Sequence, residues 1–234
     1  MIDSTPFSDF SEQGESPLGD AQPDVPHTLE VLPDGREAVV IGQPEDFKEL
    51  NHKQGDNDLG FKETCGLVSC EDVIRQFGSD VSETDVVDYA ARNGLCQVTD
   101  DPESSGRTTV DGQARILEDF GVPAHAELGQ TNEELAASIE EGRGVIAEVD
   151  AGTLWGDSQY SDIFGSPNHA IDVTGVARSP ETGEVLGFYI NDSGMPSSGR
   201  FVDVNTWNQA WNGSWFGGPG ELVVTDAVHT TSTA

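Results

Sequence analysis

Basic residues are scarce in this chain. Among its 234 residues only 11 are Lys or Arg, against 43 Asp or Glu, and the formal net charge is -32. A surface this acidic repels phosphate backbones and anionic membranes, so we expect neither nucleic acid nor a membrane as a partner. Two interpretations of the acidity stay open. It is either a solvated surface of the kind found in salt-adapted proteins or an acidic groove that attracts basic peptide segments.

Cysteines are also few, and long apolar runs are absent. Cys65, Cys70 and Cys96 cannot all pair within the chain, and their spacing, with no histidine pair nearby, does not fit a zinc site. We therefore expect a free thiol and no zinc site. No run approaches the roughly 18 apolar residues that cross a bilayer, and the N-terminus lacks the basic and apolar regions of a secretion signal. The expected location is the cytoplasm, or outside the cell by a route without a classical signal peptide.

The pattern along the chain predicts one main domain with short additions. Residues 1–27 have almost no aliphatic pattern and predict a flexible acidic tail. Residues 28–50 place two short apolar runs around a turn, which indicates a small hairpin or a linker. Residues 51–228 are expected to form the domain, and residues 229–234 a C-terminal tail.

Within the domain, helical patterns precede strand patterns. Helices are expected at residues 65–77, after a capping box of Ser82 and Asp85, at 110–120, and after a second capping box of Thr131 and Glu134. Strands are expected at residues 145–149, 169–176, 185–191, 201–204 and 221–224, with a short helix at 205–211 and a loop at 150–167. This order predicts the α+β class, with N-terminal helices packed on an antiparallel sheet.

One cysteine stands where the first of these helices begins. A thiol at a helix N-terminus ionises easily because it meets the positive end of the helix and unpaired N–H groups. Cys65 is in this position, and a base for it must come from elsewhere. His169 opens a strand, and Asp192 follows the strand that we expect to pair with it. If the two strands form a hairpin, the carboxylate lies beside the imidazole and orients it.

Other residues compete for these roles. Asn191 and Asp172 are alternatives to Asp192, although Asp172 should face away from His169 because side chains alternate along a strand. Cys70 and Cys96 are expected to be structural thiols. Five aromatic residues could form either a substrate-binding wall or ordinary packing: Trp155, Tyr160, Trp207, Trp211 and Trp215.

Together these segments resemble a known family. Cys65-Gly66 at a helix start, Asn168-His169 at a strand start, and the run Tyr189-Ile190-Asn191-Asp192 are similar to the papain-like cysteine peptidases. More narrowly, residues 54–225 resemble the bacteriocin-processing (double-glycine leader) peptidase-like branch. The resemblance implies a papain-like fold, a peptide or protein substrate and no cofactor. It makes Cys65 the nucleophile, His169 the general base and then acid, and Asp192 the orienting group.

The resemblance also implies an oxyanion hole. In the family, a glutamine shortly before the cysteine donates to the oxyanion together with a backbone N–H at the cysteine. Here the nearest glutamine is Gln54, 11 positions before Cys65. We expect a longer loop to return Gln54 to the site, and Asn57 is the alternative donor.

The function implied is a cysteine hydrolase, expected to be a bacterial and monomeric protein, that cleaves a peptide or isopeptide bond through a thioester intermediate. Two alternatives stay open. One is a deamidase or transglutaminase-like acyltransferase that uses the same triad on a glutamine side chain. The other is a catalytically silent papain-like domain that binds a partner.

Overall fold

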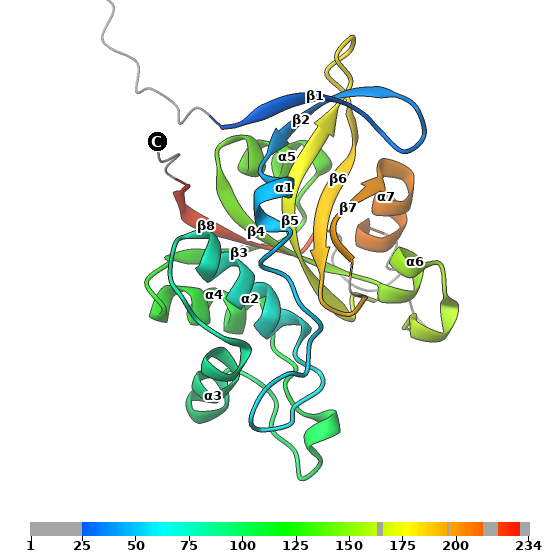
Figure 1. Ribbon diagram of the computed structural model, residues 1–234. Coiled ribbons are helices and arrows are strands. Elements are labelled where there is room, and N and C mark those ends of the chain that lie inside the picture. Colours follow the sequence, from blue (N-terminus) through cyan, green and yellow to red (C-terminus); the bar gives the residue numbers. More distant parts are fainter. Residues whose placement is uncertain (1–24, 163–165, 196, 213–219, 230–234) are drawn as a thin grey trace, which may run out of the picture.

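The structure is a computed structural model, and it describes residues 25–162, 166–195, 197–212 and 220–229 (Figure 1). Most of the expected tail at residues 1–27 and most of the expected tail at 229–234 lie outside this range. The first strand begins at His27.

All eight strands of the described residues belong to one sheet, and every pairing in it is antiparallel. The strands are β1 (His27–Val31), β2 (Glu37–Gly42), β3 (Ala124–Glu127), β4 (Arg143–Val149), β5 (His169–Arg178), β6 (Val185–Asp192), β7 (Ser197–Asp203) and β8 (Leu222–Val228). The order is β1-β2-β5-β4-β8-β3, and β6 pairs with β5 and β7. Helices combined with an antiparallel sheet confirm the α+β class.

Strand β5 connects the parts of this sheet. Along one edge its first half pairs with β4, where His169 lies opposite Val149, and its second half pairs with β2. Its other edge pairs with β6, with Asp172 opposite Asn191. This pairing confirms the hairpin expected from residues 169–176 and 185–191. Because the hairpin is antiparallel, the start of β5 and the end of β6 meet at one end of the sheet.

Helices pack on both faces of the sheet (Figure 1). The helices are α1 (Pro44–Phe47), α2 (Cys65–Gln76), α3 (Glu83–Asn93), α4 (Val110–Asp119), α5 (Asn132–Glu140), α6 (Ala151–Trp155) and α7 (Val204–Asn212). Apolar side chains of α2, α3 and α4 share one core with Ile146, Ala170 and Val223 of the sheet. Those of α5, α6 and α7 share a second core with the opposite sheet face, which includes Val149 and Ile171. The two cores are separate because neighbouring residues of a strand point to opposite faces of the sheet.

Local sequence signals account for most helix ends. The Ser82 hydroxyl accepts the Asp85 N–H, the Asp85 carboxylate accepts the Ser82 N–H, and Thr131 and Glu134 form the same capping box. Each box satisfies N–H groups that a helix start leaves without partners. Gly94 ends α3 in the left-handed conformation that glycine adopts without strain.

The prediction of a loop at residues 150–167 was wrong in part. Its first half folds into α6 and a short 3-10 helix, Ser158–Tyr160. The Asp150 carboxylate accepts the Thr153 N–H at 2.8 Å and so caps α6. Two further elements, α1 and β3, were not expected, because each is only four residues long and carries little apolar pattern.

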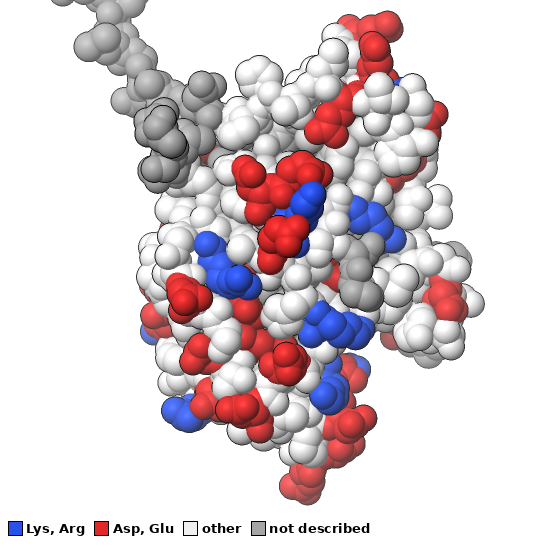
Figure 2. Space-filling view, in the orientation of Figure 1, with Lys and Arg blue, Asp and Glu red and all other residues white. Residues whose placement is uncertain are grey.

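Acidic side chains outnumber basic ones on the surface that Figure 2 shows. On the face shown in Figure 2 they spread over both the helical and the sheet regions, while Lys and Arg form separate smaller patches. Several of these basic patches lie along the middle of the face, where Figure 1 shows the segment between α1 and α2.

Candidate active site

Cys65 is the first residue of α2, as the sequence predicts. No acidic residue occupies the first turn of this helix, so nothing there opposes an anion at its positive end. The next residue is glycine. A Cβ at position 66 would lie 2.6 Å from Thr108 Cγ2 and 2.7 Å from Gln113 Nε2, so a larger residue would displace these side chains from the helix start.

His169 and Asp192 form a direct hydrogen bond at the end of the sheet. His169 Nε2 lies 2.8 Å from Asp192 Oδ1, and the two residues are 4% and 0% exposed. The hairpin of β5 and β6 brings them together, as expected. Cys65 lies next to the ring and acts to raise the pKa of His169. Since Nε2 faces Asp192, the ring nitrogen that remains for Cys65 is Nδ1.

The Asp192 carboxylate is held from several directions. Its Oδ1 accepts the Gly194 N–H at 2.9 Å and the Met195 N–H at 3.2 Å, and its Oδ2 accepts the Trp155 indole N–H at 2.7 Å. These donors fix the carboxylate in place and favour its ionised form. Sequence analysis did not assign Trp155 this contact, because its position in α6 was not expected.

The pair is charged at neutral pH. Burial acts to lower the pKa of His169, but the hydrogen bond to Asp192 and the neighbouring Cys65 raise this pKa to about 10. Burial acts to raise the pKa of Asp192, but the His169 ring and the Trp155 N–H hold it below its usual value. His169 is therefore an imidazolium at neutral pH, and a cation in this position stabilises a neighbouring thiolate.

Cys65 and His169 both line a pocket of about 390 Å³. Trp155 and Tyr160 form part of its wall, with ring centroids 5.0 Å apart, and the Trp155 ring lies edge-on to His169 at 5.2 Å. The two other tryptophans of the described chain, Trp207 and Trp211, are buried in the core. Trp215 lies outside the described residues.

Gln54 also lines this pocket. Its backbone N–H donates to the Ser193 carbonyl at 3.1 Å, and its side-chain amide donates to the Lys62 carbonyl at 2.8 Å. The loop therefore returns Gln54 to the vicinity of Cys65. Asn57, the alternative donor, turns its amide to the Phe61 carbonyl and to Glu83 and does not line the pocket.

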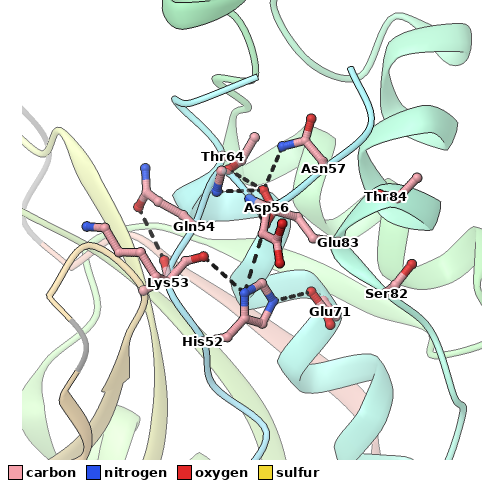
Figure 3. A network of polar contacts seen from close by, with 12 residues as sticks. His52, Lys53, Gln54, Asp56, Asn57, Thr64, Glu71, Ser82, Glu83 and Thr84 are labelled. Atoms are coloured by element: carbon pink, nitrogen blue, oxygen red, sulfur yellow. Dashed lines mark hydrogen bonds and ion pairs between the residues drawn. The ribbon is translucent and has the colours of Figure 1, made fainter. Parts of the chain in front are cut away.

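A buried carboxylate that sequence analysis did not single out fixes this loop. Figure 3 shows Glu83 and Glu71 on one side of the segment from His52 to Asn57, with the Lys53 and Gln54 side chains pointing to the other side. Four groups donate to the Glu83 carboxylate: Gly55 N–H at 2.9 Å, Asp56 N–H at 2.8 Å, Asn57 Nδ2 at 2.9 Å and Thr64 Oγ1 at 2.6 Å. Glu83 thus connects the loop to Thr64, the residue that precedes Cys65.

The other predicted candidates lie away from the pocket. Cys70 is fully buried, and Asp172 accepts a hydrogen bond from Gln76 at 2.6 Å rather than meeting His169. Asn191 donates to the Phe47 carbonyl at 3.0 Å. Cys96 is half-buried. Within the described ranges, no three or more His, Cys, Asp or Glu side chains are grouped so that they could hold a metal ion, and none of the helices there is long and apolar enough to span a membrane.

No protein-family model matches this chain, and no curated protein matches its sequence. Among solved structures, it is similar to a crystal structure described as a "putative C39-like peptidase from Bacillus anthracis", with a TM-score of 0.51 and 16% sequence identity. The match covers 78% of this chain and 96% of the other. Similarity at this level shows a shared fold, which fits the papain-like fold that the sequence resembles.

Proposed function

We propose that this protein is a cysteine hydrolase that cleaves a peptide or isopeptide bond, with Cys65 as nucleophile, His169 as acid and base, and Asp192 as the orienting group. The observation that carries the proposal is the buried His169–Asp192 pair in one pocket with a helix-start thiol. The solved neighbour is described as a C39-like peptidase, which supports a cysteine peptidase in general terms.

The proposed reaction has two halves. The Cys65 thiolate attacks the substrate carbonyl, and the bond to the amine breaks as the His169 imidazolium gives that amine its proton. A thioester and a neutral ring remain. His169 then takes a proton from water, whose oxygen attacks the thioester, and the carboxylic acid leaves as the thiolate re-forms. Asp192 holds the ring through its hydrogen bond with Nε2, so Nδ1 is the nitrogen that gives and takes the proton in both halves.

The oxyanion formed in each half needs donors. The N–H of Cys65 is available because the first residues of a helix have no acceptor within it. The Gln54 amide has two N–H bonds, and donation to the Lys62 carbonyl uses one of them. We propose the other as the second donor of the oxyanion hole.

Peptide cleavage tests this function. The protein is incubated with a mixed peptide library, and new peptide ends are identified by mass spectrometry beside a Cys65→Ala control. We expect cleavage that the control lacks. A gain of about 1 Da at glutamine with ammonia release and no new ends would indicate the deamidase alternative instead. No chemistry on any peptide, with an unreactive Cys65, would favour the silent binding domain.

A further inference from the structure

Two lysines at the candidate active site have no acidic partner among the residues that the structure describes. Of the 11 basic residues, all but Lys53 and Lys62 have a carboxylate oxygen of the described residues within 4.0 Å. This is unusual in a chain with 43 Asp and Glu. Both lysines line the pocket that contains Cys65 and His169.

Within the described part of the chain, both lysine ammonium groups donate to backbone carbonyls. Lys62 Nζ donates to the Gly55 carbonyl at 2.7 Å, and Lys53 Nζ donates to the Gly194 carbonyl. Gly194 lies directly against the site, since a Cβ built on it would be 2.8 Å from His169 Cε1. Carbonyl oxygens position an ammonium group without cancelling its charge, so both charges remain available to a ligand.

The rest of the pocket does not neutralise them. Its lining includes one carboxylate, Glu63, which already lies 2.6 Å from Arg107 Nε. The contacts of Glu83 with the loop hold the backbone of this segment, and Figure 3 shows the Lys53 side chain directed away from Glu83. The pocket is therefore locally basic on a strongly acidic protein. This opposes the acidic groove considered from composition.

We propose that Lys53 and Lys62 form an anion-binding subsite that receives a carboxylate of the substrate next to the bond that is cleaved. This inference rests on the proposed function and names its substrate class, an acidic peptide. The two ammonium groups in the pocket lining compensate a carboxylate that the acidic surface would otherwise repel. The subsite thus selects acidic peptides while the remaining surface repels other anions.

Alkylation of Cys65 by two small probes tests the subsite without a peptide. Iodoacetate carries a carboxylate and iodoacetamide is its neutral counterpart, and both react with the same thiolate. The rate with iodoacetate divided by the rate with iodoacetamide is measured at Cys65 and for glutathione. The Cys65 value divided by the glutathione value therefore reports the charge around the thiolate. We expect a normalised ratio of about five or more, since one close charge pair changes a rate or affinity about fivefold. Added salt should lower it.

Three variants complete the test. Lys53→Met and Lys62→Met should each lower the ratio about threefold, and the double variant should bring it below that of glutathione. Lys48→Met is the matched control, because Lys48 is the remaining lysine and pairs with Glu45 outside the pocket. It should leave the ratio unchanged. A wild-type ratio at or below that of glutathione, or one that persists in the double variant, would overturn the subsite alone. A Cys65 that reacts with neither probe would overturn the proposed function and the subsite with it.

Peptide pairs identify the source of the carboxylate. Cleavage rates are compared for Glu and Gln at each position near the cleaved bond, and for a free and an amidated C-terminus. A preference for Glu that the double variant loses assigns an acidic side chain to the subsite. A preference only for the free C-terminus assigns the terminal carboxylate. Equal rates throughout contradict the proposal.

Discussion

The Glu83 carboxylate offers the most quantitative test of how this site is held together. It is 2% exposed and accepts four hydrogen bonds, three at Oε1 and one at Oε2. A hydrogen bond to a charged acceptor contributes about 1.5 to 3 kcal/mol, and one to a neutral acceptor about 0.5 to 1.5 kcal/mol. Glu83→Gln keeps one oxygen and turns an amide N–H₂ toward a donor that then lacks an acceptor.

The expected loss of stability in Glu83→Gln follows from these hydrogen-bond energies. In Glu83→Gln the retained hydrogen bonds weaken and one donor loses its acceptor, and both effects destabilise the fold. Local relaxation and the easier burial of a neutral side chain offset part of this loss. The free energy of unfolding should therefore fall by about 2 to 4 kcal/mol. Urea denaturation at neutral pH measures it. Glu45→Gln is the control, since the Glu45 side chain is 73% exposed in its pair with Lys48 and should cost less than about 0.5 kcal/mol. Amide hydrogen exchange should accelerate at Gly55 and Asp56. A cost below about 1 kcal/mol with unchanged exchange at these amides would refute the role given to Glu83.

Three further variants address other parts of the site. Glu71 raises the pKa of His52 from 6.5 to about 9, against the effect of burial, so their pair stabilises the fold fully below about pH 6.5 and this contribution is lost as the pH rises through 9. The loss of unfolding free energy in His52→Gln should therefore be larger at about pH 6 than at about pH 10, and an equal loss at both would contradict the charged pair. Gly194→Ala would place a Cβ 2.6 Å from Trp155 Cζ2 and 2.8 Å from His169 Cε1, so iodoacetamide should alkylate Cys65 at least about tenfold more slowly. An unchanged rate would show that the ring position does not matter. Trp155→Phe removes the indole N–H from the buried Asp192 carboxylate but keeps an aromatic ring beside His169, so the free energy of unfolding should fall by about 1.5 to 3 kcal/mol. Peptide cleavage by the folded variant should also fall about tenfold, and an unchanged cleavage rate would assign Trp155 a purely structural role.

Much of the site could be predicted because its parts lie on short-range patterns. The helix at Cys65 follows from apolar periodicity ahead of a glycine stop, and Gly66 has a packing reason at the helix start. The distance between His169 and Asp192 follows from one hairpin, since antiparallel pairing brings the start of one strand to the end of the next.

The supporting residues could not be predicted in the same way. Glu83 follows Ser82 and looks like an ordinary acidic residue in the first turn of a helix, whereas its partners lie 19 to 28 positions earlier in the chain. Trp155 reaches Asp192 only because α6 forms, and this five-residue helix is marked in the sequence mainly by its two ends, the cap Asp150 and the left-handed Gly156. Net charge gave no indication that Lys53 and Lys62 gather at the pocket, because it sums over the surface and says nothing about where charges lie.

Selective alkylation of Cys65 tests the central claim most directly. With limiting iodoacetamide at about pH 6, only a thiolate stabilised by its surroundings reacts appreciably, and burial raises the pKa of both Cys70 and Cys96. Peptide mass spectrometry should find Cys65 labelled at least about tenfold faster than the other two cysteines, and His169→Ala should remove this selectivity while the fold is retained. Equal labelling of the three cysteines, or selective labelling that survives in His169→Ala, would contradict the proposed pairing of thiolate and imidazolium.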